Sequence, residues 1–247
     1  AIDVTLTRLS PAKLAPVIRR GERDTGVEFQ LGRTPAGLTL YALGTGAHGA
    51  QPERGNNALT ALLSALAALP LEDGPSARTI RGLAGLFPHG DTQGKALEMA
   101  CADEISGSLT LNFSVLELDQ MGFSAQFDCR FPLCAQEKAL LSRLSAALSP
   151  LGAEVTDPGL VPPHCVPEDD PFVQTLLGVY HDYTGQSARC LAIGGGTYVH
   201  DIPGGVAFGC AMPGVDNRMH EPDEFAILDD LVLSAKMFAQ VILDVCG

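Results

Sequence analysis

The sequence lacks any apolar run long enough to span a membrane, and it lacks a signal-peptide pattern. Basic residues are few: 16 Lys and Arg stand against 29 Asp and Glu, so the formal net charge is −13 over 247 residues. This balance disfavours nucleic acids and anionic membranes as partners. We therefore expect a soluble protein that binds neither.

Cysteine pairs with the CxxC spacing are also absent. The seven cysteines are scattered and odd in number, which disfavours a disulfide framework or a cysteine zinc site and predicts reduced thiols in a cytoplasm. Cys129 and Cys190 fall among apolar residues of predicted strands, so we expect both in the core.

Alternating apolar residues predict three strands in the first part of the chain, around residues 2–6, 27–31 and 38–42. Gly32 to Gly37 predicts the hairpin loop between the last two. A helix is expected to begin at Ser10-Pro11, and a second one to be capped by Asn56 or Asn57 and to end before Pro70.

The pattern then recurs. Further elements are predicted as strands around 109–115, 123–131 and 154–156 and a helix over 135–148, whereas 71–106 is predicted to be irregular. The order of elements favours an α+β domain with antiparallel sheets, helices on one face and two βαβ-like halves.

Four prolines between Asp157 and Pro167 indicate an interdomain connection, which predicts domains at 1–160 and 161–247. In the second domain we expect a helix from Asp170-Pro171 to Gly185, a buried strand at 190–193, a strand at 206–210 and a helix at 229–245. These elements predict an α/β segment that forms half of a larger catalytic domain.

Several segments carry residues suited to chemistry. Gly194, Gly195 and Gly196, followed by Thr197, allow close approach of the backbone to a ligand; a tight strand-to-loop turn is the alternative, and the two are compatible. His220, in Met219-His220-Glu221-Pro222-Asp223-Glu224-Phe225, is either a metal ligand or a surface-loop residue.

Two further side chains are candidates. His48 lies among glycines before a helix start, where it could polarise a carbonyl or remain a solvated loop residue. Arg130 shares a strand face with Asp128, so it could clamp a carboxylate or form an exposed pair with that neighbour.

Together these segments resemble, in order, the motifs of the co-catalytic zinc peptidases, especially the PepV-type and carnosinase-like bacterial dipeptidases. The resemblance is carried by the Gly194–Tyr198 run, Val206–Gly209, Pro213-Gly214, the His220 segment, the block Gly46–Ala58 and Phe127–Pro132.

This resemblance implies a lid domain joined to the C-terminal part of a catalytic domain. It implies that His220 is a zinc ligand, that His48 stabilises the tetrahedral intermediate and that Arg130 binds the substrate carboxylate, with Gly194, Gly195, Gly196 and Thr197 near the substrate. His200 stands where the family usually has Arg, so a substrate contact at that position does not carry over.

The implied reaction is hydrolysis of a dipeptide by water activated by two zinc ions, with manganese or cobalt as alternatives. In the family the other metal ligands precede the lid, so the expected partner is a missing N-terminal catalytic half, and the chain alone is expected to be inactive. The alternatives are a non-catalytic fragment or interaction module of the same fold, and an anion-binding domain that uses the glycine turn.

Overall fold

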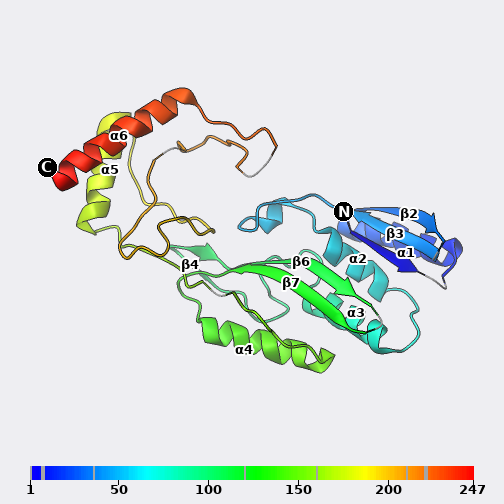
Figure 1. Cartoon of the computed structure of the whole chain (residues 1–247). Helices are drawn as coiled ribbons and strands as arrows, with labels where there is room; N and C mark the ends of the chain where they lie inside the picture. Colours follow the sequence, from blue (N-terminus) through cyan, green and yellow to red (C-terminus); the bar gives the residue numbers. More distant parts are fainter. Residues whose placement is uncertain are drawn as a thin grey trace. The chain divides into compact units, whose positions relative to one another are not determined.

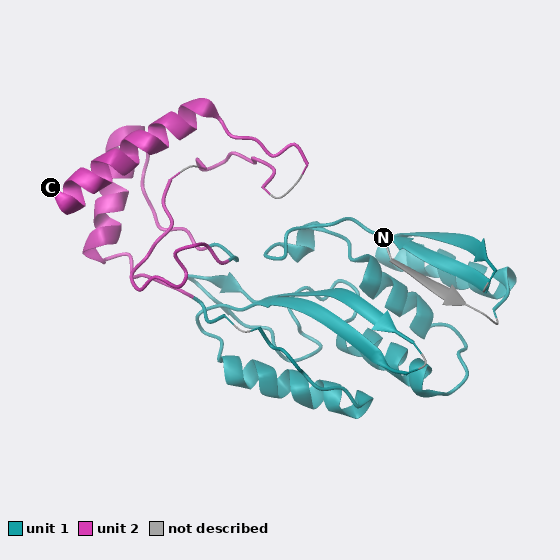
Figure 2. Ribbon diagram, viewed as in Figure 1, with its two compact units in different colours: residues 1–163, 193–195 teal, residues 164–192, 196–247 magenta. Residues whose placement is uncertain are grey.

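The computed structural model describes residues 2–6, 9–35, 37–119, 121–159, 161–209, 211–219 and 222–247. The chain divides into two compact units, one of residues 1–163 with 193–195 and one of residues 164–192 with 196–247 (Figure 2). The chain passes from the first unit to the second within the proline-rich segment at 157–167.

The first unit begins with a three-stranded antiparallel sheet of order β1-β3-β2 (Figure 1), formed by β1 (Ile2–Leu6), β2 (Glu28–Thr34) and β3 (Gly37–Leu43). These elements confirm the three predicted strands. The predicted loop from Gly32 to Gly37 is too long, because strand pairing continues to the Thr34–Gly37 pair.

Two helices pack against this sheet, α1 (Pro11–Thr25) and α2 (Ala58–Ala67). Asn57 caps α2, since its side-chain oxygen accepts hydrogen bonds from the backbone N–H groups of Leu59 and Thr60 at 2.9 and 3.1 Å. Asn56, the other predicted cap, instead donates its side-chain amide to the Thr25 carbonyl at 2.9 Å. Apolar side chains of the sheet and both helices form a first core, which includes Leu14, Val27, Phe29, Leu38, Leu40, Ala61, Leu62, Ala65 and Leu66.

A second antiparallel sheet pairs β6 (Thr110–Leu118) with β7 (Phe123–Arg130), as predicted, and a short hairpin of β4 (Ala102–Asp103) and β5 (Gly107–Ser108) precedes it. Asp119 closes the β6–β7 turn by accepting hydrogen bonds from the N–H groups of Met121 and Gly122. With α4 (Glu137–Leu148) this sheet builds a second core, which includes Leu59, Leu63, Leu83, Phe87, Leu109, Leu111, Phe113, Leu140 and Leu144.

Two predictions for this unit are wrong. The segment 71–106, predicted to be irregular, contains α3 (Pro75–Leu86), which has Pro75 at its first turn and buries Ala77 and Leu83. The predicted strand at 154–156 does not form: Val155 packs its side chain against the second core, but no neighbouring strand supplies a hydrogen-bonding ladder. The second half therefore lacks the closing strand of a βαβ-like unit.

The second unit contains α5 (Pro171–Thr184) and α6 (Leu228–Cys246), which pack around Leu176, Val179, Met237 and Val241. Both helices were predicted, as were the cap Asp170, which accepts from the Phe172 N–H at 2.8 Å, and the left-handed Gly185. No helix in the described part of the chain is long and apolar enough to cross a membrane.

The strands predicted at 190–193 and 206–210 do not form among the described residues. Leu191 and Ile193 are 64% and 65% exposed, and Cys190, predicted to be a core residue, is exposed as well. A strand needs a neighbouring strand to satisfy its backbone groups, and no described segment pairs with either stretch. The described part of the second unit is therefore helical with irregular segments, rather than α/β.

Candidate functional site

The loop that carries His48 leaves the end of β3 and returns through a short bridge. Thr45 and Asn56 exchange backbone hydrogen bonds at 3.0 and 2.8 Å, which closes the loop and fixes its base. The exposed His48 accepts a hydrogen bond at Nδ1 from the backbone N–H of Ala50, at 3.3 Å. This bond places the proton of the neutral ring on Nε2, which makes Nε2 a hydrogen-bond donor.

Arg130 ends β7, and Asp128 lies two residues earlier on the same face of the strand. The guanidinium binds both carboxylate oxygens of Asp128, with Nε–Oδ1 at 3.1 Å and Nη2–Oδ2 at 2.9 Å. This bidentate pairing is the main cause that raises the pKa of Arg130. The two side chains are about one third exposed, at 31% and 39%, so the guanidinium stays accessible while its orientation is fixed.

The glycine run meets this ion pair. Nη1 of Arg130 donates a hydrogen bond to the carbonyl oxygen of Gly194, and a Cβ on Gly195 would lie 3.1 Å from the same nitrogen. The sequence predicted close approach of this backbone to a ligand; the contact that the structure shows is one in which a backbone carbonyl accepts from Arg130.

Two glycines allow the three segments to approach one another. A Cβ on Gly49 would lie 2.6 Å from Oδ2 of Asp128, and a Cβ on Gly194 would lie 2.7 Å from Cβ of Ala50. Thr110 holds the loop against the sheet by donating its hydroxyl to the Gly49 carbonyl at 3.3 Å. We call the residues Gly49, Ala50, Asp128, Arg130 and Gly194 the Arg130 cluster.

The remaining predicted residues lie elsewhere. Gly196 and Thr197 belong to the second unit, where the Thr197 hydroxyl accepts from the Val199 N–H at 3.4 Å. His220 lies outside the described residues. In the described ranges no three His, Cys, Asp or Glu side chains gather to hold a metal ion, so the described residues do not by themselves fit a zinc centre.

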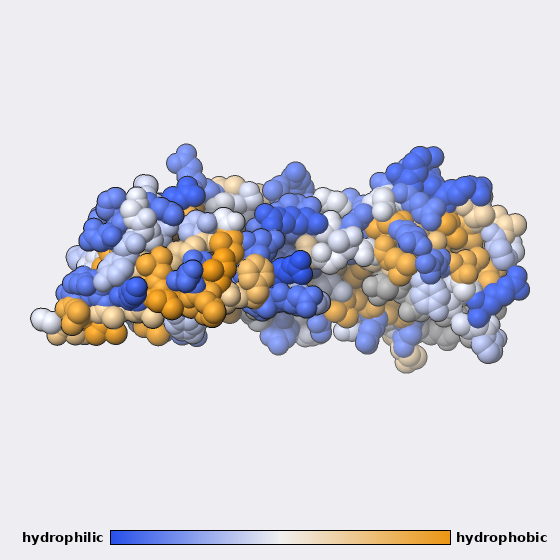
Figure 3. All heavy atoms as spheres, turned by 90° about the horizontal axis from the view of Figure 1, so that it is seen from above, coloured by the Kyte–Doolittle hydropathy of each residue, from blue (hydrophilic) through white to orange (hydrophobic). Residues whose placement is uncertain are grey.

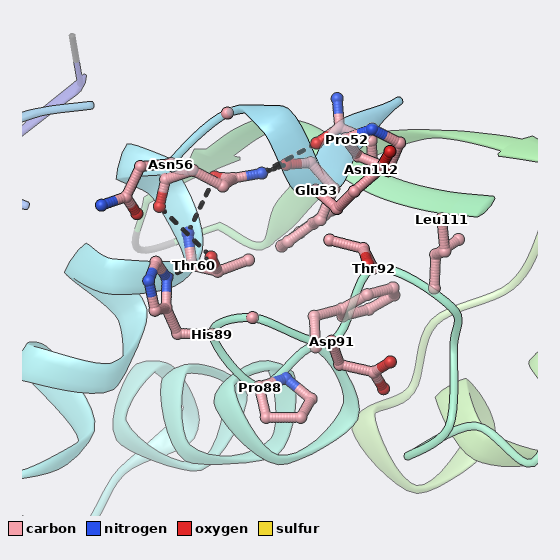
Figure 4. Close-up of a pocket in the computed structure, with 15 residues that line it drawn as sticks. Pro52, Glu53, Asn56, Thr60, Pro88, His89, Asp91, Thr92, Leu111 and Asn112 are labelled. Carbon is pink, nitrogen blue, oxygen red and sulfur yellow. Dashed lines mark hydrogen bonds between the residues drawn. The ribbon is translucent and has the colours of Figure 1, made fainter. Parts of the chain in front are cut away.

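A polar pocket in the first unit contains His89, a histidine that no sequence motif marks. His89 and its neighbours line a cavity of about 180 Å³ between the start of α2, the loop after α3 and β6 (Figure 4). The His89 ring lies 2.9 Å from the buried Thr60 hydroxyl, and burial lowers the pKa of His89. No residue spacing in the sequence would have indicated this pocket, because its walls come from three distant segments.

Asn57 also lines this pocket and links two elements. Besides capping α2, it donates its side-chain amide to Oδ1 of Asn112 at 2.9 Å and to the Phe113 carbonyl at 2.8 Å. The side-chain oxygen and amide of Asn57 both have hydrogen-bond partners within the protein. This wall of the pocket therefore has a structural role, since it connects α2 to β6.

Comparison with known proteins places these observations in a family. Residues 33–156 match the peptidase dimerisation domain. The chain is 36% identical over 208 residues to the Bacillus subtilis (strain 168) protein named "Putative dipeptidase YtjP". The aligned residues make up 84% of this chain and 44% of that protein. It is 31% identical over 237 residues to the Beta-Ala-Xaa dipeptidase of Lactobacillus delbrueckii subsp. lactis, covering 96% of this chain and 49% of the relative. The chain thus spans about half of the length of these relatives.

Proposed function

This chain belongs to the peptidase dimerisation domain family, and from this membership we propose that it serves a zinc-dependent dipeptidase of the PepV type, with its first unit as the lid domain. Its first unit supplies substrate recognition, and the reaction is hydrolysis of the amide bond of a dipeptide. We place the protein in the cytoplasm, because seven scattered cysteines without a disulfide pattern are typical of a reducing compartment.

The observation that carries the proposal is the Arg130 cluster. A guanidinium held on one edge by Asp128 and accessible on its surface suits bidentate binding of a carboxylate. Arg130 binds the C-terminal carboxylate of the dipeptide in this proposal. Asp128 is a positioning residue, because it orients the guanidinium without touching the substrate.

His48 has the second role. It directly precedes Gly49 of the cluster, and its Nδ1 contact with Ala50 leaves Nε2 as the donor. A donor at this place stabilises negative charge on the carbonyl oxygen as the amide bond is attacked. Gly194, Gly195, Gly196 and Thr197 provide backbone and hydroxyl groups beside the substrate.

The metal belongs to the complete enzyme. Two zinc ions, or manganese or cobalt in their place, would supply a water of lowered pKa as the nucleophile. His220 is the proposed ligand from this chain, and the other ligands come from a catalytic half outside this sequence. Because the described residues contain no metal-holding set, we assign them only to binding and orientation.

The second unit is proposed to be part of that catalytic domain, with the boundary between residues 160 and 161. Its helix α6 exposes a series of large apolar side chains: Leu228, Leu231, Val232, Phe238, Ile242, Leu243 and Val245. The second unit, which carries α6, shows apolar surface in Figure 3. The relatives are about twice as long as the chain, and a missing N-terminal half that covers this surface accounts for both facts.

A non-catalytic fragment or interaction module is the second candidate. It is favoured by the same exposed α6 surface, because an apolar patch of this kind marks an interaction site. In this case the Arg130 cluster would bind a carboxylate-bearing partner without turnover.

The deciding experiment measures dipeptide hydrolysis by the natural gene product and by the 247-residue chain side by side, before and after removal of metal. We expect zinc-dependent turnover by the gene product and none by the isolated chain. A gene product without turnover on any dipeptide would favour the non-catalytic module. Turnover by the isolated chain, abolished by His220→Ala, would show instead that these 247 residues are self-sufficient.

A further inference from the structure

Two cysteines that are distant in sequence are brought together at the β4–β5 hairpin. Cys101 directly precedes β4, and Cys134 lies in the turn between β7 and α4. The Cys134 N–H donates to Oδ2 of Asp103 at 3.1 Å, and the Leu133 N–H donates to the Ser106 hydroxyl at 2.8 Å. The turn that carries Cys134 is therefore attached to the hairpin by two hydrogen bonds.

The hairpin itself is held in place by the same carboxylate. Asp103 accepts from the backbone N–H groups of Ile105 and Ser106 at 2.9 and 2.6 Å and from the Ser106 hydroxyl at 2.8 Å. Hydrogen bonds from Ser106 and from the Cys134 N–H lower the pKa of Asp103 to about 2. Asp103 therefore remains an ionised acceptor at neutral pH and keeps both segments together.

Cys101 precedes Asp103 by two residues, and Asp103 binds the backbone of Cys134, so the two thiols come close enough for Cys134 to influence Cys101. Cys134 is exposed, whereas Cys101 is partly covered. Burial and the neighbouring Cys134 raise the pKa of Cys101, and the positive charge of Arg143 opposes this effect. An oxidant from solvent thus meets the exposed Cys134 before the partly covered Cys101.

We propose that Cys101 and Cys134 form a reversible redox pair, which closes to an intramolecular disulfide when a small-molecule disulfide such as glutathione disulfide is present. The Cys134 thiolate attacks one sulfur of the oxidant, the oxidant's S–S bond breaks and one glutathione thiolate leaves. Cys101 then loses its proton to water and attacks Sγ of Cys134, and the second glutathione thiolate leaves. Two protein thiols are oxidised, and one glutathione disulfide is reduced to two glutathione molecules.

The other thiols of the described chain are less suited to this exchange. Burial raises the pKa of Cys129 to about 12, so its thiolate is scarce. Cys165 and Cys190 are exposed and close enough to influence each other, but no hydrogen bond holds their segments together in the way that Asp103 holds Cys134. They serve as the competing pair in the experiment.

A disulfide between Cys101 and Cys134 would lie close in sequence to Arg130. Cys134 follows Arg130 by four residues, so a disulfide would tie the end of β7 to the β4–β5 hairpin. The oxidised protein would hold this strand end more firmly and unfold at a higher temperature, because a cross-link restricts the unfolded chain.

The test incubates the full 247-residue chain with glutathione disulfide and maps its cysteines by mass spectrometry without reduction. We expect a cross-linked peptide pair containing Cys101 and Cys134, a raised midpoint of thermal unfolding, and reversal of both by a dithiol reductant. Cys101→Ser should trap one glutathione on Cys134, and Cys134→Ser, a change at an exposed position, should abolish the cross-link. Cys246→Ser, an exposed control on α6, should leave the cross-link intact.

Glutathione found separately on Cys101 and Cys134, without a cross-link, would overturn the proposal. It would equally fail if the intramolecular disulfide formed between Cys165 and Cys190 instead, or if the Cys134→Ser chain, folded by circular dichroism, still lost two thiols to one intramolecular bond.

Discussion

Arg130 donates a hydrogen bond from Nη1 to the carbonyl oxygen of Gly194, a residue 64 positions later in the chain. The same guanidinium is held on its other edge by Asp128. One side chain thus joins the end of β7 to the glycine run that was expected to lie near the substrate. Gly49 and Gly194 have no room for a side chain because of this arrangement.

Replacing Arg130 by Ala should lower kcat/KM for dipeptides in the complete enzyme. The loss of transition-state stabilisation should be about 2–4 kcal/mol, the range for truncating one member of a desolvated charge pair. A dipeptide with an amidated C-terminus should lose much less, because it has no carboxylate for Arg130 to bind. The measurement is steady-state kinetics on both substrates. Arg81→Ala, which removes an exposed arginine on α3, is the control and should change neither; equal losses on the two substrates would contradict the carboxylate role.

Gly49→Ala should disturb the cluster, because its new Cβ would lie 2.6 Å from Oδ2 of Asp128. We expect a loss of about 1–3 kcal/mol in the free energy of unfolding, the usual cost of overpacking, measured by urea denaturation. Gly46→Ala is the matched control from the same loop, since nothing lies within 4 Å of a Cβ there. If both variants unfold at the same urea concentration, the close approach of Gly49 to Asp128 is not present in solution.

Asn57→Ala should destabilise the first unit by about 2 kcal/mol, because it removes a helix cap and leaves the Phe113 carbonyl without its donor. Asn57→Asp keeps the capping acceptor but loses the amide donor, and it places a carboxylate against the acceptors of Asn112 and Phe113. Thermal unfolding of both variants separates the two contributions. An Asp variant as stable as the wild type would show that the link to β6 contributes nothing.

His89 should make stability depend on pH near neutrality. Burial lowers its pKa in the folded state, so the unfolded chain takes up the proton more readily as the pH falls. The free energy of unfolding should therefore decrease as the pH drops through 6.5. His89→Gln should flatten this dependence, whereas His181→Gln, an exposed control on α5, should preserve it. Urea titrations between pH 5.5 and 7.5 measure the difference, and an unchanged slope in His89→Gln would refute the assignment.

Much of the lid fold could be read from the sequence, because alternation of apolar residues such as Leu38 and Leu40 reports directly which face of a strand is buried. Helix ends could be predicted equally well: Asp170 caps the start of α5 with its carboxylate, and Gly185 takes the left-handed conformation at its end. The helix α3 was missed because Gly82 and Gly85 lower its propensity and because only Ala77 and Leu83 are buried.

The predicted strand at 190–193 failed for a different reason. An apolar run predicts burial only when some other segment covers it, and Leu191 is exposed in the described chain. Local sequence carries no information on whether a partner strand is present, so the prediction depended on a fold larger than the described part of this chain.

The candidate site could be predicted only in pieces. The shared strand face of Asp128 and Arg130 followed from the alternation of β7, and their ion pair confirms it. The meeting of this pair with Gly49 and Gly194 did not follow, since no residue spacing encodes contacts across more than sixty positions. His89 was overlooked for the same reason.

The helix α2 belongs to both apolar cores of the first unit. Leu59 and Leu63 face one core, and Ala61, Leu62 and Ala65 face the other. Neither half of the lid can therefore be excised as an autonomous folding module, because each half would lose one wall of its interior with the cut. Opening of either half exposes a face of the same helix, so slow amide exchange in the two sheets should be lost together rather than one sheet after the other.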